Sequence, residues 1–254
     1  MNANEILKIL STLEASEHVR IIYAAESGSR AWGFASPDSD FDVRFIFVRP
    51  LEKYFSLEGA PDFLTWQADK IFDVNGWDIA KTLRQFKKSN FALFEWTNSP
   101  IVYRTSGTWE KISAATREYF SARAVFAAYA AFARKIYQAS LCGASVSLKK
   151  YFYALRTILC RNYVAEKLSP PPVEFEKLLS AELPKDLLAA IDELSERKKS
   201  ATEKVSTAKI PVLQNFIETE LAREEQLKKS LPQESPRSWK GLNEIFRRCV
   251  RGEL

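Results

Sequence analysis

The chain has 254 residues, of which 46% are hydrophobic and 13% aromatic, a composition that builds one large or two modest folded domains and excludes a disordered protein. Its formal net charge of +5 permits a nucleotide or nucleic-acid partner without requiring one. Three widely spaced cysteines with no Cys-x-x-Cys pair argue against a disulfide framework or a zinc site, and no apolar run is long enough to span a membrane, so a cytoplasmic protein is expected.

The first hundred residues alternate helix and strand patterns. Helical spacing of apolar residues predicts helices over 5–13, 79–86 and 91–96. Short apolar or β-branched runs predict strands over 19–25, 40–48 and 70–74 and an extended piece over 101–103. The pair Asn75-Gly76 is a strong turn signal and is expected to end the third strand. Asp78 stands where the N-cap of the following helix belongs.

From Trp109 onward, strand patterns nearly vanish. Helices are expected over 109–118, 119–141, 148–168, 174–179, 183–199, 210–229 and 239–250. The change near residue 108 predicts an α+β fold in two parts. Residues 1–108 form a unit with a small mixed sheet and helices, and residues 109–254 form an all-helical unit.

Two aspartates at the start of the second strand are the most informative feature. Because strand side chains alternate, Asp40 and Asp42 point to the same face, about 7 Å apart. Neighbouring carboxylates repel each other unless a cation lies between them, and Mg²⁺ prefers such oxygen ligands. The Gly28-Ser29 turn, with free backbone N–H groups, is a natural phosphate cradle. Together they indicate nucleotide chemistry.

Three other interpretations of this stretch fail. The segment Asp38–Asp42 starts like a calcium loop, but Val43 stands where the loop needs glycine and Arg49 where it needs glutamate. The glycines do not form G-x-G-x-x-G, and no Gly-Lys-Ser/Thr P-loop is present. What remains is a Gly-Ser turn, ten residues, and Asp-x-Asp on a strand.

This arrangement resembles the nucleotidyltransferase superfamily of DNA polymerase β type, and more closely the RNA-ligase-associated nucleotidyltransferase family of bacteria and phages. The resemblance covers roughly residues 20–175. It rests, in order, on Glu26–Gly33, Ser39–Arg44, Asn75–Asp78, Lys88–Asn90, Glu95–Trp96, Ser99–Tyr103, Lys149–Tyr153 and Arg156. The first two blocks are specific together. Ser27 stands where the superfamily usually has a hydrophobic residue, a departure that the closer family shares.

By this resemblance, Asp40 and Asp42 would hold Mg²⁺ or Mn²⁺, while Gly28 and Ser29 would bind the nucleotide's β- and γ-phosphates. Arg30 lies beside that turn, so it is a candidate phosphate contact or simply a surface cation. By strand parity, Arg44 shares the aspartates' face. A phosphate contact and an ion pair between strands are equally plausible for it.

The superfamily also needs a third carboxylate on a neighbouring strand, as a metal ligand and often as the base for the acceptor hydroxyl. Asp73 is preferred, because it lies between two apolar residues as a strand catalyst does. Asp78 is the close alternative, since it belongs to a block shared with the family.

A later helix carries basic and aromatic side chains on one face. Lys149, Tyr153 and Arg156 fall at i, i+4 and i+7, with Lys150 adjacent. They are candidate contacts to the triphosphate or the base, or an exposed polar face.

The resemblance therefore implies an enzyme that transfers a nucleoside monophosphate from an NTP, expected to be ATP, to a hydroxyl acceptor, expected to be an RNA end, in RNA repair. A protein or small-molecule acceptor is the first alternative. A nucleotide-binding or toxin-neutralising module without turnover is the second.

Overall fold

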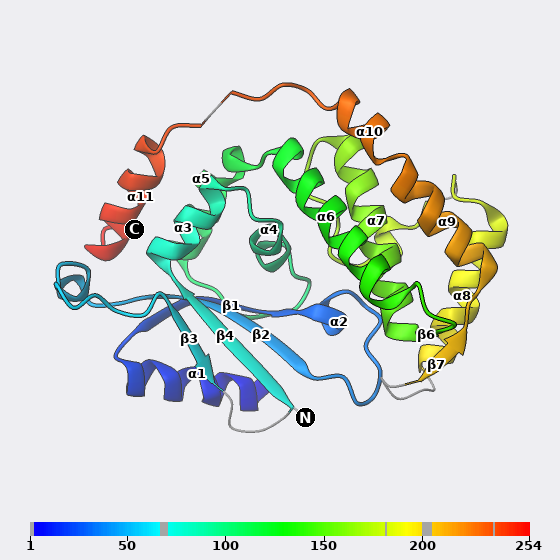
Figure 1. The fold of residues 1–254 in the computed structure, drawn as a ribbon. Coiled ribbons are helices and arrows are strands. Elements are labelled where there is room, and N and C mark those ends of the chain that lie inside the picture. The colour runs from blue at the N-terminus through cyan, green and yellow to red at the C-terminus, as the bar shows by residue number, and fades with distance from the viewer. Residues whose placement is uncertain (1–2, 67–70, 181, 200–204, 236) are drawn as a thin grey trace. The chain divides into compact units, whose positions relative to one another are not determined.

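The computed structural model describes residues 3–66, 71–180, 182–199, 205–235 and 237–254 (Figure 1). It divides the chain into two compact units, each described by itself below. Unit 1 comprises Met1–Ala31, Asp40–Phe120 and Ser235–Leu254, and unit 2 comprises Trp32–Ser39 and Ser121–Glu234.

This division differs from the boundary predicted at residue 108. The C-terminal helix α11 (Lys240–Val250) belongs to unit 1, where Leu242 and Cys249 join the core of the sheet. The Thr108 hydroxyl also donates to the carbonyl oxygen of Leu254 at 2.9 Å. Composition along the chain cannot reveal that the C-terminal helix packs against the N-terminal sheet, because this packing depends on contacts between residues more than a hundred positions apart.

Unit 1 is built on a mixed five-stranded sheet with the order β3-β4-β2-β1-β5. The strands are β1 (Arg20–Ser27), β2 (Phe41–Val48), β3 (Phe63–Trp66), β4 (Phe72–Asp78) and β5 (Val102–Arg104). The pair β2 and β4 is parallel, and every other neighbouring pair is antiparallel. The predicted α+β class is confirmed, and β1, β2, β4 and β5 lie where strands or an extended piece were predicted. Strand β3 was not predicted, and β4 begins after the undescribed residues 67–70.

Apolar side chains cover both faces of this sheet. On one face, α1 (Ala3–Glu17) buries Ile6, Leu10 and Leu13 against the strands. The other face is covered by α3 (Ile79–Lys87), α4 (Phe91–Thr97), α5 (Gly107–Thr116) and α11, on the side opposite α1 in Figure 1. Two buried faces explain why β1 and β2 are nearly continuous apolar runs rather than alternating ones.

Unit 2 is mainly helical. Its helices are α6 (Ala122–Ser140), α7 (Leu148–Lys167), α8 (Lys185–Lys199), α9 (Pro211–Ala222) and α10 (Glu224–Ser230). The expectation of an all-helical unit needs correction, because β6 (Ser145–Ser147) and β7 (Ser206–Ala208) pair as a short antiparallel ladder. These three-residue strands are too short and too serine-rich for a strand pattern.

The turn predicted at Asn75-Gly76 was wrong, since β4 continues through both residues to Asp78. Gly76 pairs with Phe45 of β2. A Cβ on Gly76 would lie 2.1 Å from the Phe45 ring, so the glycine makes room for an aromatic side chain instead of turning the chain. A local turn signal cannot reveal this long-range requirement.

No helix in the described ranges combines the length and apolar character needed to cross a membrane.

Candidate active site

The Gly-Ser turn and the Asp-x-Asp strand meet at one end of the sheet. Gly28 begins the four-residue helix α2 (Gly28–Ala31) directly after β1, with a φ of +61°. Ser27 pairs with Asp42 across the antiparallel ladder of β1 and β2. A Cβ on Gly28 would lie only 2.0 Å from Oδ2 of Asp42. The predicted phosphate turn therefore lies against a predicted metal ligand, and only glycine allows the approach.

Asp73 joins Asp42 on the neighbouring strand. The two residues are direct partners in the parallel register of β2 and β4. The Nη2 atom of Arg44 donates to Oδ1 of Asp42 at 3.1 Å and to Oδ2 of Asp73 at 2.7 Å. Arg44 thus shares the face of Asp42, as parity predicted, and forms the ion pair between strands. Its phosphate contact stays a prediction.

Asp40 lies one residue before β2 and is exposed. Its carbonyl oxygen accepts a hydrogen bond from Nε of Arg30 at 3.1 Å. The Arg30 guanidinium also stacks on the Phe41 ring, 3.9 Å from its centroid. These contacts hold Arg30, the neighbour of Ser29, at the entry to β2 beside the first aspartate.

Asp78 lies at the other end of β4. It pairs with Phe47, whereas Asp73 pairs with Asp42, so five residue rises, about 16 Å, separate the two aspartates along the strand. Asp78 accepts from the Ala80 N–H at 2.7 Å and from the Tyr54 hydroxyl at 2.8 Å. Asp78 is therefore the predicted N-cap of α3, and the structure brings Asp73 rather than Asp78 beside Asp42.

Glu26, for which the sequence predicted no role, supports the site directly. This buried side chain is 1% exposed. Its Oε1 accepts from the Asp42 N–H at 2.8 Å, and its Oε2 accepts from the Tyr103 hydroxyl. Burial raises the pKa of Glu26. The available signal was one carboxylate near the end of an otherwise apolar strand.

A pH dependence of stability follows from Glu26. Because its pKa is raised, the folded protein retains the proton to a higher pH than the unfolded chain. The stability that this proton contributes is present below the ordinary glutamate pKa of 4.5 and is lost as pH rises through the folded pKa. Urea midpoints measured over this range should fall for the wild type relative to Glu26→Gln. A difference independent of pH would contradict the assignment.

The predicted basic face lies on α7 in unit 2. The Nζ atoms of Lys149 and Lys150 lie 5.8 and 6.0 Å from the Tyr153 ring centroid. Arg156 is buried, donates to the Val173 carbonyl oxygen and stacks on Trp32 at 4.3 Å. Arg156 thus packs inside unit 2. The roles of these four side chains toward a nucleotide stay predictions.

Within the part of the chain that the structure describes, no three His, Cys, Asp or Glu side chains are grouped to hold a metal ion. Asp42 and Asp73 nevertheless suit a hard divalent cation by their chemistry, because both are carboxylates and both already bind the same cationic nitrogen atom of Arg44. A positive charge is therefore accommodated at this place.

Comparison with known proteins decides the family. The family described as "RlaP: RNA repair pathway DNA polymerase beta family" matches residues 3–248. The chain belongs to this family. The RlaP match confirms the expected polymerase β-type nucleotidyltransferase superfamily and indicates an enzyme of that general kind.

Two individual proteins are also similar. The "Uncharacterized protein YcgL" of Bacillus subtilis (strain 168) is 40% identical over 247 residues, covering 96% of this chain and 95% of that protein. A crystal structure of a nucleotidyltransferase-like protein from Exiguobacterium sibiricum 255-15 matches with a TM-score of 0.32 and 13% identity, over 98% of this chain and 80% of that one.

Proposed function

We propose that this chain is a Mg²⁺-dependent nucleotidyltransferase that transfers the nucleoside monophosphate of an NTP, ATP in the first instance, to a hydroxyl at an RNA end. The RlaP family description supports both the nucleotidyl transfer and the RNA acceptor. One observation carries the site assignment: Gly28, Asp42 and Asp73 adjoin at one end of three neighbouring strands.

The proposed transfer forms one bond and breaks one bond at the α-phosphorus of the nucleotide. The acceptor hydroxyl oxygen forms a bond to the α-phosphorus, the bond from that phosphorus to the bridging oxygen breaks, and pyrophosphate leaves. Asp73 takes the hydroxyl proton on a carboxylate oxygen. Mg²⁺, held by Asp40, Asp42 and Asp73, would supply charge stabilisation for the attacking and leaving oxygens.

The remaining residues position the triphosphate. The N–H groups of Gly28 and Ser29 and the Ser29 hydroxyl bind its β- and γ-phosphates, and Arg30 adds a positive charge at the same turn. Arg44 offsets the charge of Asp42 and Asp73 in the absence of metal, because it donates to both. Glu26 holds the Asp42 backbone through its N–H.

Label transfer from [α-³²P]ATP tests the proposal. The protein is incubated with Mg²⁺ and, separately, with RNA, protein extract or small hydroxyl compounds, with and without EDTA. We expect label on RNA, pyrophosphate release and complete loss with EDTA. Label that appears only on protein or on a small compound would show that this compound class, and not RNA, is the acceptor. Absence of transfer to every acceptor would favour a nucleotide-binding module without turnover.

A further inference from the structure

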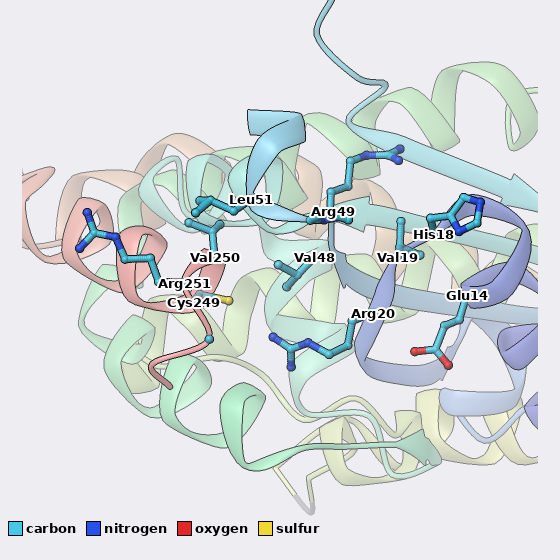
Figure 2. Close-up of a pocket in the computed structure, with 12 residues that line it drawn as sticks. Glu14, His18, Val19, Arg20, Val48, Arg49, Leu51, Cys249, Val250 and Arg251 are labelled. Carbon is cyan, nitrogen blue, oxygen red and sulfur yellow. The ribbon is translucent and has the colours of Figure 1, made fainter. Parts of the chain in front are cut away.

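A second candidate site lies in unit 1 at the other end of the same strands. A cavity of about 420 Å³ lies between the end of α1, the start of β1, the end of β2 and the last turn of α11 (Figure 2). We call it the arginine groove, because Arg20, Arg49 and Arg251 line it from three separate segments of the chain.

Carboxylates compensate the positive charge of the groove only in part. Within the described residues, the side chain of Arg20 is exposed and makes no hydrogen bond or ion pair. Arg49 donates from Nη2 to the carbonyl oxygen of Pro61 at 3.0 Å and also interacts electrostatically with the Asp78 carboxylate. Arg251 is exposed and forms a long, solvent-exposed ion pair with Glu253, with 4.0 Å between Nη1 and Oε1.

One carboxylate lines the groove, and both of its oxygens are occupied. Oε1 of Glu14 accepts from the Ile21 N–H at 2.7 Å, and Oε2 pairs with Arg104 at 2.5 Å. Glu14 therefore fixes the start of β1 and offsets Arg104, so it does not neutralise the groove's own arginines.

We propose that the arginine groove binds the sugar-phosphate backbone of RNA. Figure 2 shows the guanidinium groups of Arg20, Arg49 and Arg251 pointing in different directions rather than to one centre. A single small anion would need convergent donors, whereas successive phosphates along a strand need separate ones. Guanidinium groups match phosphate oxygens in geometry and charge. This inference rests on the RNA acceptor of the proposed function.

The groove is remote from the proposed chemistry. Arg20 begins β1 and Ser27 ends it beside Gly28, a separation of about 23 Å along the strand. A phosphate contact at that distance positions the acceptor but touches no reacting atom. Loss of the groove should therefore raise the KM for RNA and leave kcat and ATP binding unchanged.

Fluorescence anisotropy with a short labelled single-stranded RNA tests the groove. The variants are Arg20→Ala and Arg251→Ala. Arg117→Ala is the matched control, because Arg117 is an exposed arginine of unit 1 outside the groove. We expect each groove variant to bind RNA several-fold more weakly. The slope of log affinity against log salt should fall by about 0.7 for each lost phosphate contact. The control should match the wild type.

Each result separates the groove from the proposed function. If both groove variants keep the wild-type RNA affinity and salt slope, the proposal that the groove binds RNA is wrong, even where label transfer to RNA is intact. Reduced binding of inorganic phosphate, with RNA affinity unchanged, would show a small-anion site and also overturn the proposal. The wild type could also bind RNA through Arg20 and Arg251 and yet transfer no label. This result would support RNA binding by the groove and reject the nucleotidyltransferase function.

Discussion

Replacing Asp42 with asparagine is expected to lower nucleotidyl transfer by about 10²–10³-fold, the scale of losing a group that stabilises transition-state charge in a preorganised site. Asparagine keeps the shape of the side chain but removes the negative charge that a divalent cation requires. The same loss is expected for Asp73→Asn. Initial rates of label transfer from [α-³²P]ATP at saturating Mg²⁺ measure both effects.

Asp78→Asn is the matched control for these two variants. Asparagine is as good an N-cap as aspartate, so α3 and the fold should persist, and transfer should stay close to the wild-type rate. Circular dichroism melts of all three variants report whether the chain still folds. Full activity in Asp73→Asn together with an inactive but folded Asp78→Asn would assign the third carboxylate to Asp78 and overturn our choice.

Local patterns predicted the first half of the candidate site. Strand parity placed Arg44 on the face of Asp42, and the Gly28-Ser29 pair was expected to form a turn. These predictions hold because alternation and turn chemistry depend on a few neighbouring residues. The antiparallel ladder between β1 and β2 then brings the turn and the aspartate together, because Ser27 pairs with Asp42.

Long-range pairing decided what the sequence left open. Asp73 and Asp78 lie on one strand, and the choice between them depends on the register of β4 against β2, whose parallel pairing spans the connection from Val48 to Phe72. The same register explains Gly76, which faces the Phe45 ring. Glu26 was missed for a similar reason, because its partners are brought to it only by the folded sheet.

Gly28→Ala is expected to lower transfer by about 10²-fold, the scale of a displacement of about 1 Å at a reacting centre. The added methyl group would lie 2.0 Å from Oδ2 of Asp42. Either the Asp42 carboxylate moves away from Asp73, or the turn moves away from the phosphates. Kinetics at varied ATP and Mg²⁺ distinguish the two, because a displaced carboxylate weakens the response to metal and a displaced turn raises the KM for ATP.

Gly59→Ala separates this contact from backbone strain. Gly59 has a φ of +68°, close to the +61° of Gly28, but a Cβ there would meet nothing within 4 Å. Both substitutions should cost about 1–2 kcal/mol of stability for a left-handed residue, and Gly28→Ala should cost more than Gly59→Ala because its methyl group also displaces Asp42 or the turn. Only Gly28→Ala should also lose activity, because only its methyl group reaches a carboxylate of the site. Equal activity of the two variants would mean that the approach of Gly28 to Asp42 serves the fold and that the phosphate turn lies elsewhere.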